Sequence, residues 1–553
     1  MLKDQELAQQ ILDSTTLAQQ AVSGLIDVIK AEDYTLARTI SNDLRELFTT
    51  LFRAGQQLSA EDKTVNLDNM CVNLLDSLNR LSGFITSNRE KALHKIEFEL
   101  VPLLQSAHLH FYFWGRVYPD PQRMKHYYEH EKKLLAANSY IEEAEKSGKY
   151  KYELTITVIG YNKLDYTKQC VESILRTVPQ NLNYELILLN HGSTDGTKEY
   201  FESIKPTKQI DFKVNGTAGT VFPRIMEGEY MIGFSNDVIA TKNAIENMLC
   251  CMKSDPQIGW GVPTTPNVSN LQTIPANYST MAEMQDFAAR NNRYDPFRHE
   301  QRARLCNPVT FSKSSVFVSA LGFLGHFFTN GKASFPDDLI SMFCRRNGYK
   351  SILAKDAYCF HFGSVTIKDD MRKINEQEAY TRGRQDFFRA FGVDPWGTGF
   401  CYDPNMLKLV ELLTFEKINI LGVNSGLGSN PLKIKEMYKE ERHNLNAVVY
   451  NVTNQQNYVD DLRGVSDHVR YVKNINNTFA GSDEEFPSKF HHIVIDTPLN
   501  SFSDYMKLIK QCVKHLDDSG SLYSIMTKKG QELPFRKNFP NLSFNENWIR
   551  IKN

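Results

Sequence analysis

The chain has 553 residues, too many for one hydrophobic core, so we expect several domains. Its 64 Lys and Arg residues nearly balance its 65 Asp and Glu residues, and the formal net charge is −1. This balance gives no reason to expect nucleic acid or an anionic membrane as a partner. The function must therefore be argued from local sites.

The nine cysteines are odd in number and scattered, without any C-x-x-C spacing. This pattern predicts neither a disulfide framework nor a zinc site. The first residues lack the order of a secretion signal, and the sequence contains no run of about 18 apolar residues. We therefore predict a cytoplasmic protein with reduced thiols and no transmembrane segment.

The first part of the chain is poor in Gly and Pro. Apolar residues recur there at helical spacing, for example Leu36, Ile40, Leu44, Leu47 and Leu51. We predict an all-α domain over residues 1–150. It either serves interaction or homo-oligomerisation or packs as a bundle on its neighbour.

From residue 151, short β-branched runs alternate with amphipathic helical segments. The runs cover residues 154–159, 186–189 and 230–234. This alternation predicts a mostly parallel sheet with helices on its faces, in a domain spanning residues 151–402. A second alternation begins near Lys417 and predicts a separate Rossmann-like domain over residues 403–553, so the fold class is multidomain α/β.

Ligands of open α/β sheets gather beyond the carboxyl ends of the strands. The first run leads into Gly160-Tyr161-Asn162-Lys163, and the second leads into the polar turn at residues 190–197. The third run ends in Ser235-Asn236-Asp237. Such residues could bind a base, a ribose or a metal, but tight turns and helix caps use the same residue types.

Two further features are ambiguous on their own. Asp337 and Asp338 precede an amphipathic segment and could be a helix cap and a first-turn acid favoured by the helix dipole. His361 lies at the end of a run, where a histidine is usually structural.

Taken together, the motifs resemble family 2 glycosyltransferases over residues 154–400. They are, in order, Ile-Gly-Tyr-Asn, Asn-His-Gly-Ser-Thr-Asp-Gly-Thr, Ser-Asn-Asp-Val, Asp-Asp-Leu-Ile-Ser, Arg-Arg-Asn-Gly-Tyr-Lys and His-Phe-Gly-Ser. The resemblance implies a GT-A fold and a nucleoside-diphosphate sugar as donor.

The resemblance also implies roles for particular residues. Those implied to bind the nucleotide sugar are Tyr161, Asn162, Asn190, Gly192, Asp195 and Asn236. Asn190 replaces an acid often found in the family, which leaves the nucleotide preference open. The family's Asp-x-Asp motif retains only Asp237, which becomes the expected metal ligand together with His361. The expected cofactor is Mn²⁺ or Mg²⁺.

The same resemblance places the general base at the acid pair. Counting back from Gly348 favours Asp337, with Asp338 one residue away. One carboxylate that deprotonates the acceptor hydroxyl is enough for an inverting transfer. The acceptor would be a protein Ser or Thr, such as that of a bacterial surface protein, or a glycan precursor.

The C-terminal domain contains a Gly-rich turn, Gly422-Val423-Asn424-Ser425-Gly426-Leu427-Gly428, after its first strand. It resembles the first motif of class I methyltransferases. The acid expected after the second strand is missing, because Asn451 follows Tyr450. We therefore expect a degenerate domain that does not use S-adenosylmethionine (SAM).

Two alternative functions stay open. One is a bifunctional glycosyltransferase and methyltransferase, which SAM binding would reveal. The other is a catalytically silent scaffold with a glycosyltransferase-like fold.

Overall fold

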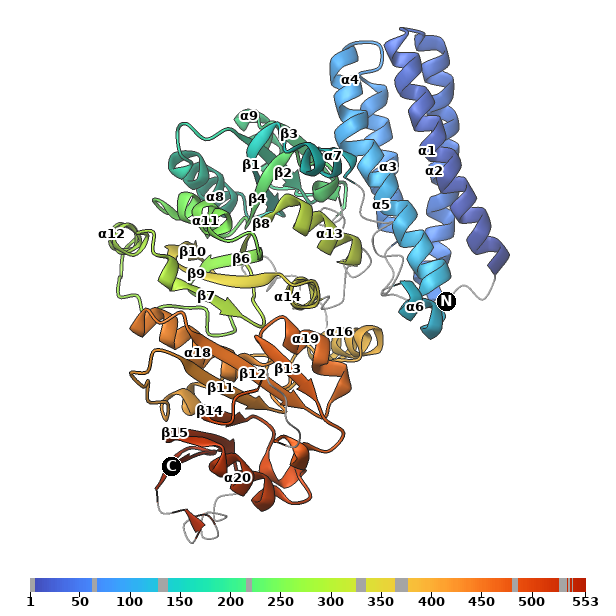
Figure 1. Ribbon diagram of the computed structural model, residues 1–553. Helices are drawn as coiled ribbons and strands as arrows, with labels where there is room; N and C mark the ends of the chain where they lie inside the picture. Colours follow the sequence, from blue (N-terminus) through green and yellow to red (C-terminus); the bar gives the residue numbers. More distant parts are fainter. Residues whose placement is uncertain are drawn as a thin grey trace.

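The computed structural model describes residues 5–61, 67–127, 138–214, 221–324, 335–363, 376–479, 486–526, 535, 538–539 and 541–553. In this part of the chain, a bundle of long helices stands beside two sheet-containing domains, which lie one below the other (Figure 1). The expected multidomain α/β organisation is confirmed. Among the described residues, we find no helix with the length and apolar character needed to cross a bilayer.

The helical bundle forms because apolar side chains recur every three or four residues and can be buried on one face. Its buried positions include Val22, Leu25, Ile29, Leu44, Phe48, Leu51, Leu74, Leu78 and Leu81. The helices are α1 (Gln5–Lys30), α2 (Tyr34–Glu61), α3 (Leu67–Ser82), α4 (Arg89–Lys95), α5 (Val101–Tyr112) and α6 (Pro121–His126). The next helix, α7 (Ser139–Ser147), packs against the central domain instead (Figure 1).

The central domain is a mixed sheet in the order β3-β2-β1-β4-β8-β6-β9-β7. Its strands are β1 (Tyr152–Gly160), β2 (Tyr184–Asn190), β3 (Lys208–Asp211), β4 (Gly228–Ser235), β6 (Ile258–Thr264), β7 (His299–Arg302), β8 (Val309–Lys313) and β9 (Lys350–Tyr358). β1, β2, β3 and β4 are parallel, as are β6 and β9, whereas β8 and β7 pair antiparallel with their neighbours. The sheet is thus mostly parallel, as expected.

Helices cover the faces of this sheet, and a separate two-stranded ladder is formed by segments that follow β4 and β9 in the chain. The helices are α8 (Leu164–Thr177), α9 (Thr197–Ile204), α11 (Ala244–Ser254), α12 (Met281–Asn291), α13 (Ser314–Leu324) and α14 (Pro336–Arg346). A further helix, α16 (Glu376–Phe391), lies away from the sheet and packs against α6 (Figure 1). The ladder consists of β5 (Val238–Ile239) and β10 (Phe360–His361), which are antiparallel.

The bundle covers the edge strand β3, which would otherwise present unpaired backbone groups to solvent. The side-chain oxygen of Asn73 accepts hydrogen bonds from the N–H groups of Lys213 (2.8 Å) and Val214 (3.0 Å). Arg80 donates to the carbonyl of Asp211 at 2.6 Å. Helix α3 therefore holds the segment that follows β3.

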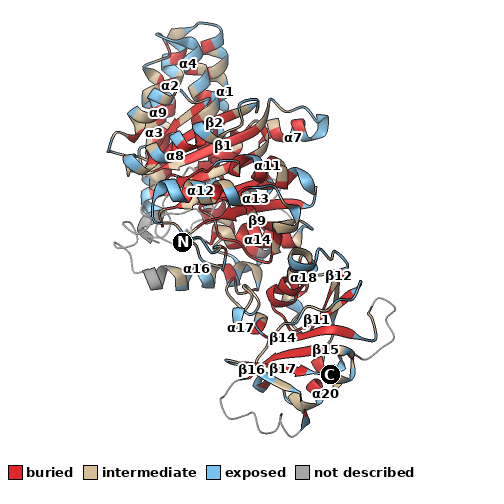
Figure 2. Ribbon diagram, turned by 90° about the vertical axis from the view of Figure 1, so that its left-hand side faces the viewer, coloured by how far each residue is buried: buried red, intermediate tan, exposed pale blue. Residues whose placement is uncertain are grey.

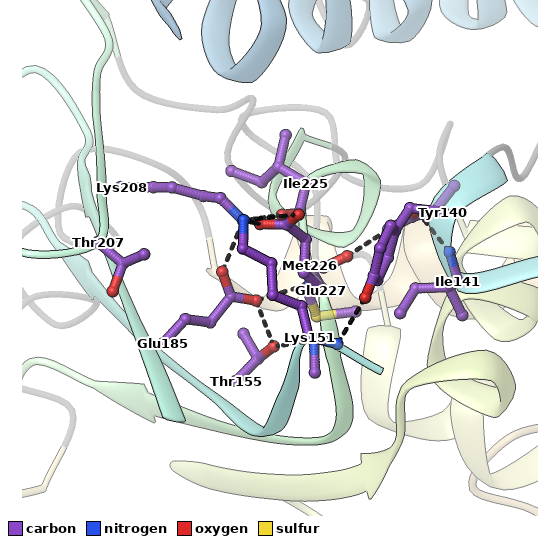
Figure 3. Close-up of polar contacts among 12 residues, drawn as sticks. Tyr140, Ile141, Lys151, Thr155, Glu185, Thr207, Lys208, Ile225, Met226 and Glu227 are labelled. Carbon is purple, nitrogen blue, oxygen red and sulfur yellow. Dashed lines mark hydrogen bonds and ion pairs between the residues drawn. The ribbon is translucent and has the colours of Figure 1, made fainter. Parts of the chain in front are cut away.

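A buried ion cluster closes the amino end of the sheet (Figure 3). Lys208 Nζ lies 2.6 Å from Glu185 and 2.7 Å from Glu227, and it also donates to the carbonyl of Ile225. Thr155 donates to the second oxygen of Glu185 at 2.6 Å. The cluster joins β1, β2, β3 and the segment before β4 without leaving a charge unpaired.

The C-terminal domain is a second sheet in the order β13-β12-β11-β14-β15-β17-β16. Its elements are α17 (Pro404–Leu407), β11 (Ile418–Val423), α18 (Ser429–Arg442), β12 (Ala447–Thr453), α19 (Val459–Arg463), β13 (His468–Tyr471), β14 (Phe490–Ile495), α20 (Tyr505–Lys514), β15 (Leu516–Ile525), β16 (Leu542–Asn545) and β17 (Trp548–Lys552). The first five strands in that order are parallel, and β17 is antiparallel to both of its neighbours. The strands of both sheets are largely buried, while exposed residues gather on the outer faces of the helices (Figure 2).

We predict that Lys208→Met lowers the free energy of unfolding by about 3–5 kcal/mol, because it leaves buried carboxylates without their counter-charge. The matched control is Lys198→Met, since Lys198 forms an exposed pair with Glu202 at 3.6 Å. That change should cost no more than about 0.5 kcal/mol. Urea denaturation of both variants measures the difference, and equal stabilities would contradict the prediction.

Candidate functional site

The end of β4 and the β5–β10 ladder bring the two predicted metal ligands together. In the ladder, His361 lies opposite Val238, the residue after Asp237. The N–H of Phe362 also donates to the carbonyl of Asp237 at 3.0 Å. As a result, Nε2 of His361 lies 3.4 Å from Oδ2 of Asp237, and both side chains are buried.

The chemistry of this pair suits a divalent cation. Carboxylate oxygens are good ligands for Mg²⁺ and Mn²⁺, and imidazole nitrogen is a common metal ligand. Among the described residues, no group of three or more His, Cys, Asp or Glu side chains could hold a metal ion. A cation held by Asp237 and His361 would therefore need oxygens from water or a bound diphosphate to complete its coordination.

The turn after β2 places Asn190 at the same edge of the sheet. Asn190 is buried; its side-chain oxygen accepts from the N–H of Ser193 at 3.0 Å, and its nitrogen donates to Asp211 at 3.2 Å. Gly192 has φ +77°, and a Cβ there would lie 2.8 Å from the carbonyl oxygen of Lys213. This close approach requires glycine.

Asp195 and Asn162 connect the turns after β1 and β2. The exposed Asp195 accepts hydrogen bonds from the N–H of Leu164 at 2.8 Å and from the hydroxyl of Thr197 at 2.6 Å. The side-chain oxygen of Asn162 accepts from the N–H of Thr194 at 2.9 Å. Both side chains thus hold the turns after β1 and β2 against each other.

Asn236 links the end of β4 to the start of α8. Its side-chain nitrogen donates to the carbonyl of Asn162 at 3.1 Å and to the hydroxyl of Thr167 at 2.9 Å. Tyr161, at the end of β1, is half-buried. The predicted nucleotide residues therefore share one edge, where Asn236 supports the loop that carries Tyr161.

The two acids at the start of α14 have different surroundings. Arg304 contacts both oxygens of the buried Asp338, at 2.5 Å and 3.2 Å, whereas Asp337 accepts from the N–H of Asn307 at 3.4 Å. Burial raises the pKa of both carboxyl groups, that of Asp337 to about 7, and Arg304 opposes the rise at each. Asp338 therefore forms an ion pair with Arg304, whereas Asp337, with its pKa raised to about 7, can exchange a proton near neutral pH.

The antiparallel strand β8 explains how α14 reaches the edge formed by β4. Val309, the first residue of β8, pairs with Phe234 near the end of β4. Just before it, the carbonyl of Pro308 accepts from the N–H of Ser235 at 2.9 Å. Since Asn307 contacts Asp337, the acid of α14 lies toward the strand end that carries Asp237.

Two residues at the site were missed from the sequence. Asp211 is the last residue of β3 and accepts a hydrogen bond from Asn190, and its position at the carboxyl end of a strand could have indicated it. Arg304 lies in a stretch without a recognisable motif, so only the folded structure shows that it pairs with Asp338.

The backbone at Thr398 and Gly399 forms hydrogen bonds with the Gly-rich turn of the C-terminal domain. The carbonyl of Thr398 accepts from the N–H of Leu427 at 2.9 Å, and that of Gly399 accepts from the N–H of Ser429 at 3.2 Å. A Cβ on Gly426 would lie 2.0 Å from the carbonyl oxygen of Thr398. Backbone amides at the start of α18 are therefore engaged within the protein.

A cleft of about 500 Å³ lies between the central and C-terminal domains. It is lined by Leu271, Thr273, Ile274, Pro275, Phe287, Asn291, Arg298, Arg302, Leu353, Lys355, Tyr402 and Glu440. None of the predicted site residues lines it. Its basic side chains also contact groups of the protein, such as Glu300 and Glu440 for Lys355.

Comparison with solved structures finds similar chains with low TM-scores. GalNAc-T7 with UDP, GalNAc and Mn²⁺ has a TM-score of 0.31 and 11% identity, covering 38% of this chain and 44% of that chain. The mannosyltransferase PcManGT from Pyrobaculum calidifontis, in complex with GDP-Man and Mn²⁺, has a TM-score of 0.29 and 16% identity. That match covers 49% of this chain and 74% of the other.

Sequence comparison matches part of the central domain to known glycosyltransferase sequences. An uncharacterized glycosyltransferase of Mycoplasma genitalium is 25% identical over 103 residues, which are 17% of this chain and 35% of that protein. Residues 155–307 match the family model of glycosyl transferase family 2. This stretch runs from β1 to the residue that contacts Asp337, and it includes Asn190 and Asp237. The resemblance drawn from the motifs is confirmed for these residues, which form a region of the glycosyl transferase family 2 type.

Proposed function

We propose that the central domain transfers a monosaccharide from a nucleoside-diphosphate sugar to a hydroxyl acceptor, with inversion and with the help of a divalent cation. The observation that carries the proposal is the Asp237–His361 pair, 3.4 Å apart, at the sheet edge toward which Asp337 is held. The family 2 match over residues 155–307 supports the reaction class. The acceptor we propose is a protein Ser or Thr, or a glycan precursor.

The donor would lie across the ends of β1, β2 and β4. In this proposal the turn at residues 190–195 and Tyr161 contact the nucleotide, while Asp237 and His361 hold the cation near the diphosphate. When bound, such a cation neutralises the charge that develops on the departing diphosphate. Asp237 and His361 are buried, which strengthens their electrostatic interaction with a bound cation.

Asp337 would act as the general base. With a pKa near 7, it is ionised in an appreciable fraction of molecules at neutral pH and is still basic enough to accept a proton from the acceptor hydroxyl. The oxygen freed of its proton then attacks the sugar carbon opposite the leaving diphosphate. Only one carboxylate is needed for inversion, and the contacts of Asp338 with Arg304 suit it to supporting the site.

The occupied Gly-rich turn bears on the bifunctional alternative. Thr398 and Gly399 engage amides that a methyl donor would need, which supports a structural role for the C-terminal domain. SAM titration tests this point. A silent scaffold is the second alternative, and the retained Asp237, His361 and Asp337 favour catalysis over it.

The first test is donor binding by thermal shift, with UDP-, GDP-, dTDP- and CMP-sugars, each with and without Mn²⁺. A ligand that binds the folded protein at about 100 times its Kd adds about 2.7 kcal/mol of stability. We expect one nucleotide class to stabilise the protein in a Mn²⁺-dependent manner. Asp237→Asn and His361→Ala should remove the Mn²⁺-dependent part of the shift, whereas Asp286→Asn, at an exposed position of α12, should not. Full retention of the shift in both site variants would contradict the metal assignment.

The second test concerns the base. For the wild type, kcat/KM should rise about tenfold per pH unit below pH 7 and level off above it, because only the ionised Asp337 accepts a proton. Asp337→Asn should lower kcat by a factor of about 10² to 10⁴ while the donor-induced thermal shift persists. An Asp337→Asn variant with normal turnover would rule out this role.

The neighbouring acid gives a different result. Asp338→Asn should lower the free energy of unfolding by about 3–5 kcal/mol, because it leaves the buried Arg304 cation without its partner. Urea denaturation measures this loss. Unchanged stability combined with abolished transfer would instead make Asp338 the base.

A further inference from the structure

We propose that Asp461 of the C-terminal domain is a positioning residue for the transfer reaction. It holds helix α14, and with it Asp337, at the edge of the central sheet. The inference rests on the proposed function, because it concerns the same base. It adds a role for a domain that carries none of the proposed catalytic residues.

Asp461 contacts the far end of the helix that carries the acids. Its Oδ1 atom lies 2.9 Å from Nε and 2.7 Å from Nη2 of Arg345. Its Oδ2 atom lies 2.9 Å from Nε and 2.7 Å from Nη2 of Arg346. Asp461 has no exposed surface, so removing either guanidinium group would take away half of the charged hydrogen bonds that compensate its burial.

The backbone after Asp461 packs directly against the same helix. A Cβ added to Gly464 would lie 2.4 Å from both Cα and the carbonyl oxygen of Arg345. The carbonyl of Gly464 also accepts from the side chain of Gln301 at 3.1 Å. Arg345 donates to the carbonyl of Ala303, next to Arg304. The end of α14 is thus confined between β7 and the turn after α19.

A second connection reaches the other end of α14. The guanidinium of Arg304, which holds Asp338, lies 5.9 Å from the ring of Trp396 and 5.8 Å from that of Phe400. Between these two aromatic residues, Thr398 and Gly399 bind the Gly-rich turn of the C-terminal domain. The C-terminal domain thus contacts one end of the helix directly and is linked to the other end through residues 396–400.

Geometry explains why this restraint matters for the reaction. Helix α14 has 11 residues, and a helix rises about 1.5 Å per residue, so its ends are about 15 Å apart. It behaves as a stiff rod over this length, and a shift at Arg345 moves Asp337. A displacement of about 1 Å of a reacting group can cost about 100-fold in rate.

The test compares full-length Asp461→Asn with Asp460→Asn. Asp460 lies on the same short helix but is exposed and pairs with the exposed Arg463, which makes it the matched control. For Asp461→Asn we expect kcat to fall about 10- to 100-fold with donor KM changed by less than about twofold, together with a shifted acid limb of the pH profile. Hydrogen exchange in residues 336–346 should become faster. Asp460→Asn should match the wild type in each measurement.

Gly464→Ala provides a second variant that keeps every charge. Its added methyl group must displace the backbone of Arg345. We therefore expect this variant to lower kcat and to speed hydrogen exchange in α14 in the same way. Its control is Gly24→Ala in α1, where the added methyl meets no atom within 4 Å. If Asp461→Asn does not fold, the Gly464→Ala result decides the proposal.

The outcomes separate this inference from the proposed function. If the wild type is active and the folded variants keep its kcat and its hydrogen exchange in α14, the positioning role is overturned. The transferase proposal then still stands. A wild type without transfer activity for any donor refutes the proposed function. In that case exchange in α14 still decides whether Asp461 holds the helix: faster exchange supports the restraint, and unchanged exchange removes it.

Discussion

An ionised carboxylate that is removed from water needs compensating positive charge. Glu300 of β7 obtains this charge from both sheet-containing domains and so links them. With 2% of its surface exposed, Glu300 contacts Arg302 and Lys355 of the central domain and Lys433 of α18. Burial alone would raise the pKa of Glu300, but the three cations hold it well below its usual range. Asp461 is the converse case. It is a buried acid of the C-terminal domain that pairs with two arginines of the central domain. Reciprocal ion pairs thus link the two sheet-containing domains, and those of Asp461 involve α14 directly.

Much of the fold could be predicted, since β1, β2, β4, β11, β12 and β14 are largely apolar runs between helices. The antiparallel strands were missed for physical reasons. β7 reads His-Glu-Gln-Arg and is buried through ion pairs, so its hydrophobicity gives no signal. β16 and β17 are short and come after the last strand that we expected. They join the sheet because β17 pairs with β15 and β16 pairs with β17. Local sequence indicates strands that are buried by apolar side chains better than strands that are buried by tertiary charge pairing.

The candidate site divides in the same way. Asn190, Asp195 and Asp237 could be named because the residues after parallel strands share one edge. The sequence favoured Asp337 over Asp338 only through the spacing to Gly348, and neighbouring residues gave no physical reason for that choice. Arg304 separates them, and its side chain reaches Asp338 only through tertiary contacts. A strand end is a local feature, whereas the protonation of a carboxyl group depends on its neighbours in space.

The contacts of Thr398 and Gly399 with the Gly-rich turn affect how this chain can vary among related proteins. Both carbonyls meet their N–H partners only if the segment between α16 and α17, residues 392–403, keeps its length. An insertion or deletion there would move both carbonyls away from the amides at once. We therefore expect a change of length in this segment to weaken the contact between the two sheet-containing domains more than a change of length in a surface loop.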